Sequence, residues 1–95
     1  MPLKISQDVR EKLDQRHKVT EDEIIECFAN RTGKYLDELR QQHQTNPNTL
    51  WFVSETDHAR KLKVVFIQHP DGVIEIKSTF PPNQTELNIY TRHGY

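Results

Sequence analysis

The sequence is poor in the residues that build disulfide frameworks, glycine-rich loops and membrane spans. It has a single cysteine, Cys27, so no disulfide can form within the chain, and this suits a reducing compartment. Its three glycines are isolated, and none belongs to a phosphate-binding loop. No apolar run approaches the roughly 20 residues of a transmembrane helix, and none resembles a signal peptide. These absences predict a soluble cytoplasmic protein with no membrane partner.

Length and charge set further limits. The chain has 95 residues, of which 34% are hydrophobic and 28% charged, so we expect one domain over residues 1–95 with a small core. The formal net charge is −1, so no overall field draws the chain to nucleic acid. Binding to RNA would therefore require a local basic patch.

Three runs rich in β-branched and aromatic residues dominate the second half of the chain, at residues 50–56, 61–68 and 73–77. The segment His69-Pro70-Asp71-Gly72 separates the last two, and its proline, aspartate and glycine each favour a tight turn. The segment Asp57-His58-Ala59-Arg60 separates the first two but contains neither glycine nor proline. The pattern predicts an antiparallel meander.

Alternation within these strands predicts one apolar sheet face and one mixed face. The apolar face is expected to hold Leu62, Val64, Phe66, Ile74, Ile76 and Phe80, and the mixed face Lys61, Lys63, Val65, Ile67, Val73, Glu75 and Lys77. The mixed face is either a functional surface or an exposed face that its charges keep soluble.

Capping boxes mark the starts of two helices. Thr20 followed by Glu23 predicts a helix over residues 21–30, and the same spacing after Asn83 predicts a short helix over residues 84–92. The buried face of the first helix is predicted to consist of Ile24, Ile25, Cys27 and Phe28. Cys27 is therefore expected to be a core residue and not a nucleophile.

The remaining segments are less uniform. Apolar residues at spacing four, beginning at Ile5, predict a helix over residues 5–15 that must dock to be stable. Residues 34–40 fit either a helix or a short edge strand. Residues 41–49 form a polar stretch that is either a substrate or partner loop or a plain surface loop. The expected fold class is α+β, with a small antiparallel sheet of three to four strands and helices packed on one face.

No strong catalytic motif is present. The five histidines are scattered without metal-site spacing, so we expect no metal and no cofactor. Cations and proton carriers do gather around the predicted sheet, namely Arg40, His43, His58, Arg60, Lys61, Lys63, Glu75, Lys77 and Tyr90. Metal-free RNA cleavage needs a base, cations at the phosphate and an acid. The set permits such chemistry without requiring it.

Segments spread over residues 10–91 carry a family resemblance. They are the helix entry His17-Lys18-Val19-Thr20, the acidic run Asp37 to Arg40, the strand pair Trp51-Phe52-Val53 and Arg60 to Phe66, and the ending Ile76-Lys77-Ser78 with Glu86 and Tyr90. In this order they resemble the BrnT family of bacterial toxins, which is similar to the RelE-type ribonucleases.

The resemblance implies a RelE/BrnT-like fold, a strand at residues 34–40, endoribonucleolytic cleavage of messenger RNA, and a ribbon-helix-helix antitoxin as partner. By position, Arg40 and Arg60 match the family's basic site residues and Tyr90 matches its helix tyrosine. The family's arginine in the last strand falls on Phe80 here, a loss that removes a contact to phosphate.

Two main hypotheses follow. In the first, the chain is a toxin-type ribonuclease whose catalytic residues are Arg40, His43, Arg60, Glu75 and Tyr90 and whose RNA contacts are Lys61, Lys63 and Lys77. In the second, it is a non-catalytic relative that binds a protein partner, as the neutral charge and the missing arginine favour. Hydrolysis of ADP-ribose conjugates is a less favoured third reading, because such enzymes use clusters of metal-binding carboxylates.

Overall fold

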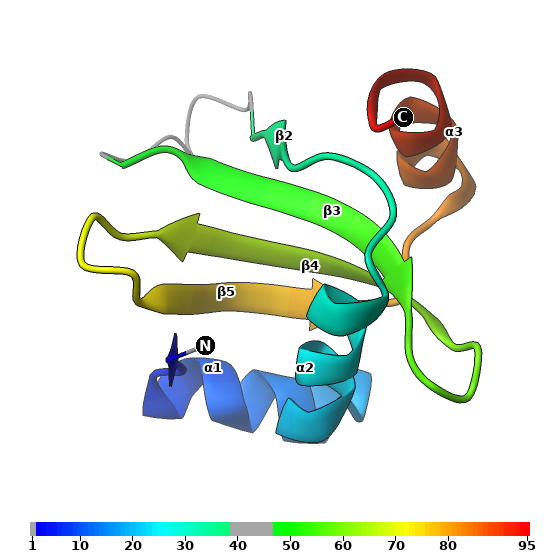
Figure 1. Cartoon of the computed structure of the whole chain (residues 1–95). Helices are drawn as coiled ribbons and strands as arrows, with labels where there is room; N and C mark the ends of the chain where they lie inside the picture. Colours follow the sequence, from blue (N-terminus) through cyan, green and yellow to red (C-terminus); the bar gives the residue numbers. More distant parts are fainter. Residues whose placement is uncertain (1, 39–46) are drawn as a thin grey trace.

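The computed structural model describes residues 2–38 and 47–95, which form a five-stranded mixed sheet with helices (Figure 1). In chain order the elements are β1 (Leu3–Lys4), α1 (Gln7–Lys12), the π-helix η1 (Leu13–His17), α2 (Glu21–Asn30), β2 (Leu36–Asp37), β3 (Thr49–Glu55), β4 (Lys61–Gln68), β5 (Ile74–Phe80) and α3 (Gln84–His93). The fold class is therefore α+β, as predicted.

The sheet has more strands than predicted. Its order is β1-β5-β4-β3-β2, and the central meander of β3, β4 and β5 is antiparallel. The two-residue strand β1 pairs in parallel with β5, so the expectation of a purely antiparallel sheet of three to four strands is wrong. A strand this short has no hydrophobic period that the sequence could reveal. At β2, the strand alternative for residues 34–40 is confirmed.

The helices begin where the capping residues predict. Both capping boxes are formed: the Thr20 hydroxyl accepts from the N–H of Glu23 at 3.2 Å, and the Asn83 side chain accepts from the N–H of Glu86 at 2.8 Å. The helix expected over residues 5–15 is confirmed as α1 continuing into η1. None of the described helices is long and apolar enough to cross a membrane.

The core lies between the apolar sheet face and the N-terminal helices. The Phe28 ring of α2 lies 4.8 Å from the ring of Phe52 and 5.3 Å from that of Phe66. Cys27 is fully buried beside it, and burial raises the pKa of its thiol to about 12, so it is a core residue as predicted. The prediction for Ile25 is wrong, because it lies on the outer side of α2 with 44% of its surface exposed.

A β-bulge changes the face on which β5 ends. Val65 pairs with Ser78 but Phe66 pairs with Ile76, so Lys77 is the extra residue. Beyond it the alternation is shifted by one. Phe80 therefore lies opposite Lys63 on the mixed face, and its predicted place on the apolar face is wrong.

The helices do not share one face of the sheet, which corrects a second prediction. The α3 helix packs on the mixed face, where the Tyr90 ring lies 5.7 Å from that of Trp51. Trp51 and Phe52 are consecutive residues of β3, so their side chains point to opposite faces. Figure 1 shows α3 well apart from α1 and α2. Where α3 covers it, the mixed face is therefore a second packing surface and is not open.

Candidate functional site

Arg60, the central cation of the predicted site, is engaged within the fold. Its guanidinium donates to the backbone carbonyls of His17 and Lys18, both at 2.9 Å, and to the Glu23 carboxylate at 3.1 Å. These contacts hold the end of η1 and the start of α2 against the β3–β4 turn. Burial raises the pKa of Glu23, but hydrogen bonds from Thr20 and Arg60 outweigh it, so the pKa is lowered overall.

The turn that carries Arg60 is itself unusual. Ala59 has φ +66°, a left-handed conformation that disfavours residues with a side chain. The Thr56 hydroxyl stabilises the turn by accepting from the N–H of His58 and of Arg60. The segment lacks glycine and proline, so its composition does not indicate this left-handed residue.

Lys63 also makes its contacts within the fold. Only 5% of the residue is exposed, and its Nζ lies 2.7 Å from a Glu86 carboxylate oxygen and 4.5 Å from the centroid of the Trp51 ring. The other carboxylate oxygen of Glu86 accepts from the N–H of Asn83 and so closes the capping box of α3. Lys63 therefore anchors the start of α3 to the mixed face.

The surroundings of Tyr90 indicate a structural role and not a catalytic one. Its hydroxyl donates to the carbonyl of Lys34 at 2.7 Å, and the residue is 2% exposed. Burial raises the pKa of Tyr90 to about 12, with a further contribution from Tyr95. At neutral pH the hydroxyl keeps its proton, so its observed role is to fasten α3 to the segment before β2.

Glu75 belongs to a different group, which we name the hairpin cluster: His69, Glu75 and Lys77. His69 Nε2 lies 2.8 Å from one Glu75 oxygen, and Lys77 Nζ lies 3.7 Å from the other. The hydrogen bond with His69 is the main cause of a lowered Glu75 pKa, which burial opposes and Lys77 and Lys4 reinforce. All three side chains reach solvent, so this cluster can exchange protons and meet a ligand.

His69 was not among the predicted site residues. A signal existed, because a hairpin closed by His69 to Gly72 places its flanking residues across from one another. Ile67 pairs with Glu75, and His69 lies two residues further along the same face, so the two side chains are diagonal neighbours.

The predicted catalytic residues do not converge. Arg60 directly precedes β4, whereas Glu75 pairs with Ile67 near the other end of that strand. At about 3.3 Å per residue they lie on the order of 20 Å apart. Lys63 also stays apart from Glu75 and Lys77, because the register places Phe80 opposite Lys63.

The other predicted residues are divided between these regions. Lys61 is exposed at the Arg60 end of β4, and Lys77 is exposed in the bulge of β5. Arg40 and His43 lie outside the described residues. Among residues 2–38 and 47–95 there is no group of three side chains suited to a metal ion.

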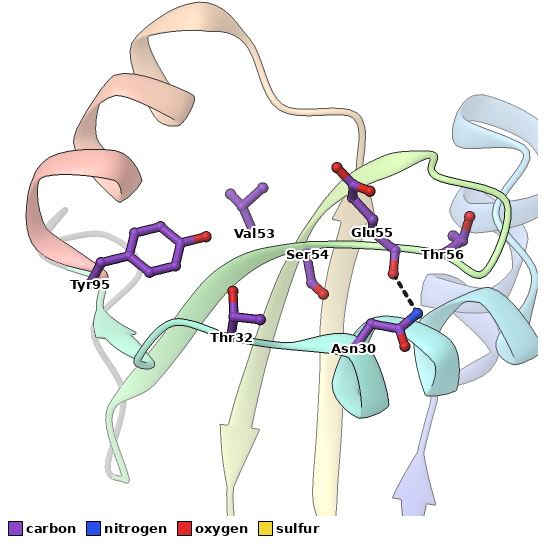
Figure 2. A pocket seen from close by; sticks show the side chains of 7 residues that line it. All are labelled: Asn30, Thr32, Val53, Ser54, Glu55, Thr56 and Tyr95. Carbon is purple, nitrogen blue, oxygen red and sulfur yellow. Dashed lines mark hydrogen bonds between the residues drawn. The ribbon is translucent and has the colours of Figure 1, made fainter.

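A pocket of about 260 Å³ lies elsewhere, along the outer edge of β3 (Figure 2). We call it the edge pocket, and its lining residues are Asn30, Thr32, Val53, Ser54, Glu55, Thr56 and Tyr95. The Asn30 amide donates to the carbonyl of Glu55 at 3.0 Å and so bridges α2 to β3 at one end of it. No predicted site residue lines this pocket.

Comparisons of the chain with protein-family models, curated proteins and solved structures gave no match. The likeness to BrnT and RelE therefore stays a prediction from the sequence.

Proposed function

We propose that the chain is a non-catalytic protein-binding module on a BrnT-like scaffold. The observation that carries this proposal is the environment of Arg60, whose guanidinium is engaged by two backbone carbonyls and a carboxylate of the same chain. An arginine held in this way has few donors left for a phosphate. Lys63 supports the same reading, since it is buried against Glu86.

The partner suggested by the family resemblance is a ribbon-helix-helix antitoxin, and we place the pair in the cytoplasm. The formal net charge of −1 fits a protein partner better than an RNA partner. Calorimetric titration with a ribbon-helix-helix protein encoded beside this chain tests the pairing. A stoichiometric complex would support it, and the absence of heat would remove this partner.

Metal-free RNA cleavage is the second candidate, and the hairpin cluster is the observation that favours it. A carboxylate can accept the proton of a 2′-hydroxyl, an adjacent imidazole can carry protons, and an ammonium can stabilise the phosphate. Glu75 brings these groups together, with His69 at 2.8 Å from one of its oxygens and Lys77 at 3.7 Å from the other. Hydrolysis of ADP-ribose conjugates has no observation in its favour.

Incubation of the purified chain with single-stranded RNA in chelator separates the two candidates. The binding-module proposal predicts no cleavage by the wild type or by the His69→Gln and Lys61→Gln variants. Cleavage that leaves a 2′,3′-cyclic phosphate, is lost in His69→Gln and persists in Lys61→Gln would overturn it in favour of the hairpin cluster. Lys61 is the matched control because it is exposed at the far end of β4.

A further inference from the structure

The edge pocket lies beyond the point where β2 stops pairing with β3. Leu36 pairs with Trp51, and the N–H of Glu38 donates to the carbonyl of Thr49 at 2.8 Å. In an antiparallel pair every second residue directs its N–H and C=O to the same neighbour. The backbone groups of Thr49, Trp51 and Val53 therefore all point to this outer edge.

The next rung of the ladder would join Val53 to Lys34, but Lys34 is engaged elsewhere. Its N–H donates to the carbonyl of Gly94 at 2.6 Å, and its carbonyl accepts from the hydroxyl of Tyr90. The segment before β2 is thereby drawn toward α3. Among residues 2–38 and 47–95, no partner takes the outward N–H and carbonyl of Val53, which lines the pocket.

Glycine at position 33 allows the segment before β2 to approach α3. A Cβ atom at this position would collide with the Tyr90 hydroxyl and lie 2.8 Å from the Gly94 carbonyl. Glycine permits the close approach that keeps the segment on α3. The unpaired position at Val53 therefore follows from the amino-acid sequence.

The Ser54 hydroxyl provides an independent indication of a ligand. Ser54 is 8% exposed, and its Oγ is buried with no hydrogen-bond partner among the described residues. Figure 2 shows this hydroxyl directed toward the segment that carries Thr32 and Asn30. A buried polar atom left without a partner is costly, and such atoms in native proteins commonly find one in a water or a ligand.

The chemistry of the lining restricts the ligand. None of the seven lining residues is cationic, and Glu55 adds a carboxylate, so phosphates and carboxylates are disfavoured. The groups on offer are an adjacent N–H and C=O and a hydroxyl. The volume of about 260 Å³ falls just below the roughly 300–1,000 Å³ of drug-sized ligand sites, which suits a short segment.

We propose that the edge pocket binds one extended peptide residue at the open rung of β3. The carbonyl of that residue accepts from the Val53 N–H, its N–H donates to the Val53 carbonyl, and the Ser54 hydroxyl makes a third contact. A peptide segment of a protein partner supplies these two amide groups by strand addition, whereas a free small amide can make only one of the two rung hydrogen bonds. The inference rests on the proposed binding function only for the choice of a peptide partner.

Hydrogen exchange of the free chain tests the open rung. Phe52 and Ser54 direct their N–H groups to β4, whereas that of Val53 faces the pocket, so Val53 should exchange at least ~10-fold faster than both. Equal protection of the three amides would show that the rung is occupied and would overturn the inference.

An NMR titration of the full chain tests the ligand. We expect N-acetylalanine N-methylamide to shift the Val53 amide signal saturably with a Kd of about 1–10 mM, and acetate to leave it unchanged. Ser54→Ala should weaken the peptide analogue about 2–10-fold, while Ser78→Ala, the same change on β5, should not. Ser54→Ala removes only an unpaired hydroxyl, so the variant should remain folded.

N-methylacetamide, a single amide, tests whether a whole peptide residue is needed. Weaker binding than that of the peptide analogue supports an extended peptide residue at the rung, and equal binding would overturn it. An unmoved Val53 signal, equal binding of acetate, or an unchanged affinity in Ser54→Ala would overturn the proposal. RNA cleavage combined with a saturable Val53 shift would defeat the binding-module function but leave this site standing.

Discussion

The two ends of β4 carry similar charged residues in opposite circumstances. At the first end, Arg60 and Lys63 are bound by carbonyls and carboxylates of the same chain. At the second end, Glu75 and His69 are about as exposed as Arg60 and Glu23, but they pair through their side chains alone. A cation that the sequence predicts to be functional can thus serve the fold instead, and its contacts decide between the two roles.

The largest predicted effect is at Lys63. Lys63→Met should lower the free energy of unfolding by about 3 kcal/mol, because Glu86 is left without its buried partner beside the start of α3. Urea denaturation measures this value. Lys61→Met, an exposed neighbour on the same strand, should change it by at most about 0.5 kcal/mol. Equal effects of the two changes would contradict the anchoring role of Lys63.

Arg60 comes next. Arg60→Ala should cost about 2 kcal/mol, since two backbone carbonyls and Glu23 lose a charged donor. The same denaturation experiment measures it, with Arg92→Ala on the exposed side of α3 as the control. If Arg60→Ala were as stable as the control, Arg60 would be free to serve a ligand.

A change in the turn beside Arg60 should have a smaller effect and should stabilise the protein. Ala59→Gly should stabilise the chain by about 1 kcal/mol, because glycine adopts φ +66° without the steric cost that alanine bears. Ala29→Gly, in the exposed part of α2, should instead destabilise by a similar amount. Thermal unfolding of the two variants checks the sign, and a destabilised Ala59→Gly would contradict the left-handed turn.

The smallest effect concerns pH at the hairpin cluster. The folded pKa of Glu75 lies below its ordinary value, so its contribution is present above the unfolded pKa of about 4.3 and is lost as pH falls through the folded pKa. Wild type should therefore lose more stability between about pH 5 and pH 2 than Glu75→Gln does. If the two proteins lost the same stability over this pH range, the pairing of Glu75 with His69 would contribute no stability.

Local chemistry was readable from the sequence, and long-range pairing was not. The box of Thr20 and Glu23 and the turn ending at Gly72 formed as predicted, because their hydrogen bonds join residues three apart. Phe80 was assigned to the wrong face because a bulge depends on how two strands pair. Arg60 meets carbonyls more than forty residues earlier in the chain, which no spacing rule reveals.

The same division applies to the candidate sites. His69 and Glu75 were visible as flanks of one hairpin, yet nothing in the sequence ranked that pair above the other histidines. The edge pocket depends on Lys34, Tyr90 and Gly94, which meet only after α3 has docked. Its discovery required the structure.

The side-chain ¹⁵N–¹H spectrum of Arg60 tests the central comparison most directly, with Arg92 as an exposed reference. We expect separate, exchange-protected guanidinium signals for Arg60 that do not change when single-stranded RNA is added. A rapidly exchanging Arg60 guanidinium like that of Arg92, or one that shifts with RNA, would contradict it and return Arg60 to a functional site.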